Sequence, residues 1–240
     1  MVVVVLVAYL ALGGFASHSA GSNGTTFASA DSLANSAANG VSGGPWHLVT
    51  AVGYAPAAAS QTNTSSSVGT GCSVVPPGSG AIPSQINISA FSGSFSSGAA
   101  TWWAMFYVST SAPQVLLVEV ANGAATPLLV ITGGACVGSF LGLSAVPSTV
   151  LDSSSAMSLV WGQGGSAFVA AHSNVSLNLE MGVLGGGVID GTSVGASWAI
   201  DLSPCLPLGL GGPVGNQPEF EAIVNSTAGT VTTDVTSTTC

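Results

Sequence analysis

The chain contains no lysine and no arginine, so its nine aspartates and glutamates give a formal net charge of -9 over 240 residues at pH 7. An ordinary soluble domain is about one quarter charged. Without cations the chain cannot neutralise nucleic-acid phosphates or bind anionic lipid through a basic patch. It also lacks a phosphate-loop lysine, an arginine finger and a Schiff-base lysine. Nucleic acid is therefore excluded as a partner, together with several classes of enzyme.

The absence of lysine and arginine also affects how the stability of the protein responds to acid. Acid denaturation is mostly the protonation of carboxylates that are paired in the native state, and this chain has no lysine or arginine to pair with them. Below about pH 4 carboxylates become neutral, and only His18, His47 and His172 would gain charge. We expect a protein adapted to an acidic exterior, as in an acidophile. The alternative is compositional drift without a selected purpose.

Cysteines and asparagines indicate an exported protein. No CxxC pair and no histidine at metal-ligand spacing accompanies the four cysteines, so we expect two disulfides and no zinc: they are Cys72, Cys136, Cys205 and Cys240. Of the three connectivities, local loop closure favours Cys72 with Cys136 and Cys205 with Cys240. Five asparagines begin N-x-S/T and predict N-linked glycans, unless serine and threonine richness alone produced them: Asn23, Asn63, Asn87, Asn174 and Asn225.

Residues 1–16, MVVVVLVAYLALGGFA, form an apolar run that Gly13 and Gly14 interrupt. The run is shorter than the 18 or more residues of a membrane-spanning helix. It is either an atypical secretion signal, or a mature N-terminus from which a basic leader has been removed and which needs a partner to cover it. The second interpretation makes these side chains the assembly surface: Val2, Val3, Val4, Val5, Leu6, Val7, Tyr9, Leu10, Leu12 and Phe15.

Three regions follow along the chain: an apolar assembly or anchor segment over 1–22, a short helix and linker over 23–42, and a glycosylated β domain over 43–240. The helix is predicted from a Thr25 or Thr26 cap, apolar residues at helical spacing from Phe27, and a stop at Gly40. Roughly nine strands predict a mainly β, sandwich-like fold. Their segments are WHLVTAVGYA, INISAFSG, TWWAMFYVS, QVLLVEVANG, TPLLVITGG, SAFVAAH, VSLNLEMGVLG, ASWAIDLSP and FEAIVNSTAGTVTTDV.

Few residues offer chemistry. Glu219 and Glu221 alternate along a predicted strand, and paired carboxyls that share a proton perform acid hydrolysis, although no hydrolase motif surrounds them. His47 and His172 would need to meet Glu180 to hold a metal, and nothing in their spacing requires it. We therefore predict no catalytic residue, no metal ligand and no cofactor.

Two further groups have structural interpretations. Asp152, Asp190 and Asp201 adjoin turn residues, where an aspartate usually hydrogen-bonds its local backbone. Trp102 and Trp103 are consecutive in a strand, so that they face opposite sides of the sheet. The outward tryptophan would serve a sugar-binding platform or a subunit contact, or would be buried by a second sheet.

The closing FEAIVNSTAGTVTTDV predicts two strands around a Ser-Thr-Ala-Gly turn, which resembles the ending of PepSY-type and pilin-like exported domains. Together with the apolar N-terminus, the Ser/Thr/Gly-rich β domain and the N-x-S/T sites, the chain resembles archaeal surface-filament subunits, above all type IV pilin-like proteins. The resemblance implies a cell-surface homopolymer whose tails bundle as helices and meet a membrane only before assembly.

The run Val2 to Val5 leaves donor-strand insertion open as a second mode of assembly. A secreted acid hydrolase and a monomeric carbohydrate-binding module remain the alternative functions.

Overall fold

The computed structural model describes residues 23–63, 73–77, 85–182, 196–204 and 216–239. The apolar segment 1–22, and with it every predicted tail-assembly residue, lies outside the described residues. Asp190 and three of the cysteines, Cys72, Cys205 and Cys240, also lie outside them, and the side chain of Cys136 is not described. Within the described ranges, no helix has the length and apolar character needed to cross a membrane.

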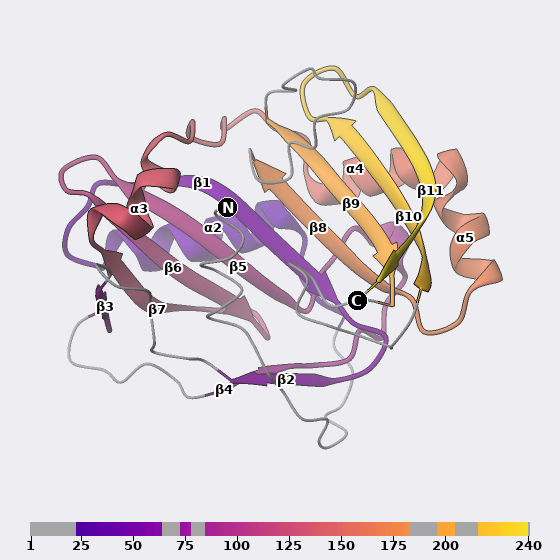
Figure 1. Ribbon diagram of the computed structural model, residues 1–240, viewed down its shortest axis with the longest axis horizontal. Coiled ribbons are helices and arrows are strands. Elements are labelled where there is room, and N and C mark those ends of the chain that lie inside the picture. The colour runs from indigo at the N-terminus through magenta and orange to yellow at the C-terminus, as the bar shows by residue number, and fades with distance from the viewer. Residues whose placement is uncertain (1–22, 64–72, 78–84, 183–195, 205–215, 240) are drawn as a thin grey trace.

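One antiparallel sheet of nine strands dominates the fold, in the order β11-β10-β9-β8-β1-β5-β6-β7-β3 (Figure 1). Its strands are β1 (Trp46–Ala55), β3 (Ser73–Val75), β5 (Trp102–Ser109), β6 (Gln114–Ala121), β7 (Ala124–Thr132), β8 (Ser176–Gly182), β9 (Ser197–Ser203), β10 (Asn216–Asn225) and β11 (Val231–Thr239). A separate two-stranded sheet pairs β2 (Ser60–Asn63) with β4 (Gln85–Ile88). The mainly β class expected from the sequence is confirmed.

The large sheet consists of two similar halves that meet at β1 and β8. Each half is a helical segment with four strands: α2 (Phe27–Asn39) precedes β1, β5, β6 and β7, and α4 (Ser153–Val160) with α5 (Ser166–Ala171) precedes β8 to β11. The ninth strand, β3, is added beside β7 at the edge of the first half. The first strand of each half lies at the centre, where β1 and β8 run antiparallel and Val52 is paired with Glu180. Trp103 of β5 and Trp198 of β9 occupy corresponding places and their rings lie 6.4 Å apart.

The helix face of the sheet, on the side of α2 and α4, is apolar in both halves. Ala30, Ala34 and Ala38 recur at helical spacing in α2 and are fully buried, because small side chains let the helix lie close to the strands. Phe27 at the start of α2 contacts the rings of both Trp103 and Trp198. One continuous core therefore joins the two halves.

The opposite face differs between the halves. Over β1, β5, β6 and β7 it carries a second apolar core, which includes Trp102, Phe106 and Leu117 and packs with β4 and with α3 (Gly134–Leu141). In the other half the positions corresponding to Phe106 and Leu117 are Asp201 and Glu221, which are likewise directly paired. The apolar second layer is thus replaced by carboxylates.

The helix prediction over residues 25–40 is confirmed, with Thr26 and Gly40 as the flanking residues of α2. Its cap differs from the expectation, because the Thr26 side chain makes no capping hydrogen bond. Instead the Phe27 N–H donates to Ser153 Oγ at 2.9 Å and the Ala28 N–H donates to Asp152 Oδ1 at 2.8 Å. The expectation that Asp152 bonds its local backbone is wrong, because its carboxylate caps a helix 124 residues earlier in the sequence.

Most predicted strands are present, including the closing hairpin of β10 and β11. The segment SAFVAAH is not a strand, since it forms α5, which a π-helical segment (Trp161–Gly165) joins to α4. A run of six apolar or small residues fits either structure, and here burial of Phe168 on the helix face selects the helix. INISAFSG contributes only its first residues, to β4.

Candidate functional site

Five of the chain's nine carboxyl groups lie on the same face of four neighbouring strands: Glu180 of β8, Asp201 of β9, Glu219 and Glu221 of β10, and Asp234 of β11. We call these five the carboxylate cluster. Their common face follows from the pairing, because Asn178 is opposite Asp201, Asp201 is opposite Glu221, and Glu221 is opposite Asp234. Directly paired residues of antiparallel strands project to one side.

Three members of the cluster are half-buried, and Glu221 and Asp234 are exposed. Burial raises the pKa of Asp201 well above its usual value, and the charges of Glu180, Glu219 and Glu221 raise it further. Burial also raises the pKa of Glu180. With no lysine or arginine in the chain, neither of these side chains can balance the negative charges of the cluster, whereas protonation removes them. Asp201 and Glu180 therefore keep their protons to higher pH than isolated carboxyls do.

Asn178 of β8 lies on the same face as the carboxylate cluster and is directly opposite Asp201, so it continues this row of polar side chains toward the centre of the sheet. It is only 4% exposed, and its side-chain oxygen Oδ1 has no hydrogen-bond partner. Its neighbours across the strands are Asp201 and Tyr54. Burial raises the pKa of Tyr54 to about 12, with a hydrogen bond to Ser176 acting in the opposite direction. Both neighbours, the Tyr54 hydroxyl and a protonated Asp201 carboxyl, are groups that can donate a hydrogen bond to such an oxygen.

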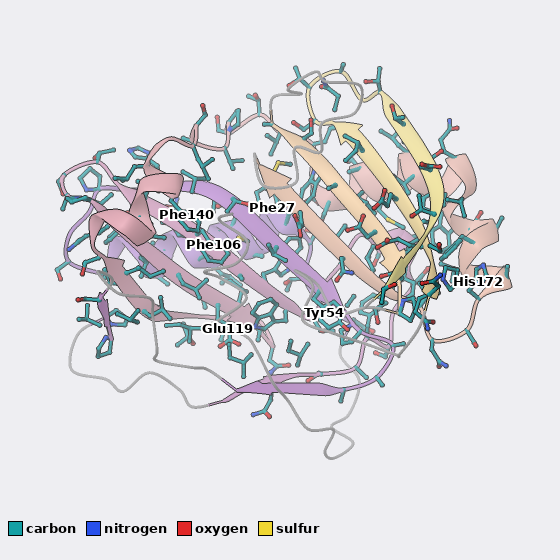
Figure 2. All side chains as sticks on the ribbon, in the orientation of Figure 1. Phe27, Tyr54, Phe106, Glu119, Phe140 and His172 are labelled. Carbon is teal, nitrogen blue, oxygen red and sulfur yellow. The ribbon has the colours of Figure 1, made fainter. Side chains whose placement is uncertain are left out.

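A second polar site lies at the other end of the sheet. A cavity of about 310 Å³ there is lined mainly by polar groups: Ile86, Asn87, Glu119, Ala121, Asn122, Ala124 and Thr126. Trp102 Nε1 donates a hydrogen bond of 2.8 Å to Glu119 Oε1, which fixes the carboxyl at the cavity wall. Burial nevertheless raises the pKa of Glu119. Figure 2 shows Glu119 well apart from His172, which lies beside α5.

The structure brings together the two glutamates predicted as a pair, since Glu219 and Glu221 share one face of β10. It adds Asp201 to them, which the sequence interpretation expected to hydrogen-bond local backbone beside a turn and which lies inside β9, directly opposite Glu221. That expectation for Asp201 is wrong. The hydrolase hypothesis stays a prediction, with Asp201 joined to its carboxyl set.

The suggested metal ligands are not brought together. His47 is near the start of β1, whereas His172 follows α5 and precedes β8, whose first residues lie by the other end of β1. The length of β1 separates them, roughly 25 Å at about 3.3 Å per residue. Among the described residues, no group of three histidines, cysteines or carboxylates has a geometry that fits a metal ion.

Trp102 and Trp103 do face opposite sides of the sheet, as their positions predicted, and both are buried. Trp103 Nε1 donates to the Thr25 carbonyl at 3.0 Å, and Trp102 is 2% exposed. Trp102 is therefore not a sugar-stacking platform. Burial on both sides of the sheet accounts for the pair.

The predicted glycosylation sites fall on varied backbone. Asn23, Asn87 and Asn174 are exposed, Asn174 with a left-handed φ of 62°. Asn225 is half-buried at the β10–β11 turn, where its Oδ1 accepts hydrogen bonds from two backbone N–H groups. Asn63 ends β2, and its side chain is not described.

Sequence reasoning missed Glu119, Asn178 and Asp201 as site residues. The available signal was polarity within a strand, since each stands among buried apolar neighbours in QVLLVEVA, SLNLEMG or SWAIDLS. No family model, no curated protein and no solved structure matches this chain.

Proposed function

We propose that the protein is a structural subunit of an extracellular, pilus-like filament, assembled from identical glycosylated copies. The observation that supports the proposal best is the edge strand β11. It is nine residues long, most of it is exposed, and among the described residues it pairs only with β10. The other edge, β3, has three residues. A long edge strand offers a row of N–H and C=O groups to another chain.

Natural monomers protect such edges with lysine, proline, bulges or short strands. β11 contains no lysine and no proline, and its pairing with β10 runs without a break from Asn216–Thr239 to Val224–Val231. Only Asp234 interrupts its valines, threonines and serine with charge. Asp234, a charged side chain, is the one such feature present on β11, and its Oδ1 accepts a hydrogen bond of 2.8 Å from the Val235 N–H. The length, regular pairing and exposure of β11 are otherwise consistent with an edge that is covered in the working assembly.

The apolar segment 1–22 supplies the main assembly surface in this proposal, by burial among the segments of neighbouring subunits. Helical bundling and donor-strand insertion are both compatible with its composition. No lysine or arginine is present to form intersubunit salt bridges, so at pH 3, where most carboxyls are neutral, filament stability should depend little on salt concentration.

Electron microscopy of the full chain tests the proposal. We expect filaments at pH 3 and their loss in the double variant Val4→Asp, Val7→Asp, because each aspartate carries a polar group into the apolar contact. Ser17→Asp with Ser19→Asp is the matched control, which should keep the filaments. Dispersed monomers from a preparation whose N-terminus is intact by mass spectrometry would refute the proposal.

The cavity beside Glu119 favours one second candidate, a cell-surface carbohydrate-binding module. A carboxylate, two asparagine amides and a threonine hydroxyl are groups that hydrogen-bond sugar hydroxyls. Glu119→Gln should then weaken binding of a glycan by about tenfold, since a charged hydrogen bond contributes roughly 1.5 to 3 kcal/mol. Glu221→Gln is the control, and equal loss in both variants would contradict a role for the cavity.

A further inference from the structure

The edge strand β11 is close to self-complementary. Its sequence VTTDVTSTT has Val235 at the centre, and this valine is 64% exposed. If two copies lie antiparallel with their Val235 residues opposite each other, Thr233 is opposite Ser237 of the second copy. Asp234 is then opposite Thr236, so that no carboxylate directly faces another.

The two faces of β11 have different environments. Val235 is opposite the buried Phe220, which belongs to the helix-face core, so a second Val235 would continue that apolar surface. Asp234 is on the other face, at the end of the row that runs through Asp201 and Glu221. Pairing two copies would place the two Asp234 residues diagonally, at about 7–8 Å between backbone positions, and would join two acidic rows into one.

Charge decides when such a pair is stable. The second copy brings no lysine or arginine, so two ionised acidic rows repel each other, and protonation removes the repulsion. The groups that face the row are Glu180 from β8, Asp201 from β9, Glu219 and Glu221 from β10, and Tyr54 from the end of β1. All of them are acids, and none can balance the row with positive charge.

We propose that β11 is an interface between two copies of this chain, which pair edge to edge and antiparallel about Val235 in acid and separate when the carboxylate cluster ionises. This interface rests on the proposed function. It adds that a second copy of the chain is the partner of β11 and that the contact forms in acid. It concerns the edge strand, and the apolar segment 1–22 makes a different contact.

Site-specific cross-linking of the full chain tests the pairing. Residues directly opposite in antiparallel strands have Cα atoms about 4.5–5.5 Å apart, which a disulfide spans. Val235→Cys chains carrying a 2-pyridyl disulfide at position 235, mixed with Val235→Cys chains that carry the free thiol, should therefore give a covalent dimer at pH 3, because the thiol displaces pyridinethione, a leaving group that permits exchange in acid. Val75→Cys is the matched control, since Val75 is 44% exposed on the opposite edge strand, and it should give no dimer.

The association of uncross-linked chains is measured by sedimentation at pH 3 and pH 7, with Val4→Asp, Val7→Asp as the background that prevents filament growth. We expect association to weaken by about tenfold or more at pH 7, the size that two or three screened carboxylate contacts give. Val235→Lys should abolish the dimer at pH 3, because two lysines would be opposed, and Val75→Lys should not. Equal association at both pH values, or no cross-link at position 235, overturns the inference.

The outcomes separate the inference from the proposed function. Filaments without a cross-link between the two copies of residue 235 would support the proposed function and refute the β11 interface. A cross-linked dimer without filaments would support the β11 interface and refute the filament proposal.

Discussion

Replacing Asp201 by asparagine should stabilise the protein at neutral pH and leave it nearly unchanged in acid. Asp201 is directly opposite Glu221 and diagonal to Glu180 and Glu219, so its negative charge faces three others. A cross-strand charge pair contributes roughly 0.2–1 kcal/mol, with the sign reversed for like charges. One direct and two diagonal contacts therefore give a gain of about 1–2 kcal/mol for Asp201→Asn at pH 7.

The direction in which stability changes with pH follows from the raised pKa of Asp201. Burial and the neighbouring carboxylates raise the pKa of folded Asp201, so the folded chain holds this proton more tightly than the unfolded chain. The contribution of this proton to the free energy of unfolding is therefore fully present below the unfolded pKa of about 3.9. It is lost as the pH rises through the folded pKa. The wild type should unfold at lower urea concentration at pH 7 than at pH 3, and Asp201→Asn should remove part of that difference.

Urea unfolding followed by tryptophan fluorescence provides the measurement, since Trp198 lies on the same strand as Asp201. Asp234→Asn is the comparison variant, because it removes the same net charge at an exposed position where Glu221 is the only directly opposite carboxylate, and it should therefore stabilise the protein by less than Asp201→Asn does. If Asp201→Asn destabilises the protein at pH 7, or shifts both pH values equally, the electrostatic account of the cluster is refuted.

Two further predictions concern folding. Ser153→Ala and Asp152→Ala should each lower the free energy of unfolding by about 1 kcal/mol in urea titrations, because each removes an oxygen that caps α2, and no loss in either variant would contradict the long-range cap. Gly53→Ala should lower it by about 1–3 kcal/mol, since a Cβ there would lie 2.7 Å from the Trp103 ring. Gly138→Ala, where a Cβ meets nothing within 4 Å, is the control, and equal effects in the two glycine variants would contradict this packing argument.

The sequence predicted the strands that carry strong local patterns. WHLVTAVGYA and TWWAMFYVS are runs of β-branched, aromatic and aliphatic residues, and both become central strands buried on two sides. The helix α2 was predictable because its alanines recur at helical spacing before Gly40. α4 was missed because SSSAMSLV begins with three serines and shows little periodicity. Its helical structure depends on packing against the sheet, where Ala156, Met157 and Val160 are buried.

The carboxylate cluster could not be predicted, because its members come from four strands whose register the sequence does not encode locally. Glu219 and Glu221 were recognisable as a pair from their alternation in one strand. Asp201 joins them only through the pairing of β9 with β10, across more than ten intervening residues. Glu119 was overlooked since a single glutamate in an apolar strand resembles an exposed edge position until Trp102 is seen to bond it.

The capping of α2 by Asp152 and Ser153 has a consequence for biosynthesis. The ribosome must add more than 120 residues after Phe27 before the two oxygens that complete the start of this helix exist. Before that point the start of α2 has neither capping oxygen, and β1 lacks its neighbouring strand β8. A chain that ends before Asp152 would therefore expose both the uncapped N–H groups of α2 and one edge of β1, and an exposed strand edge is a place where another chain can pair.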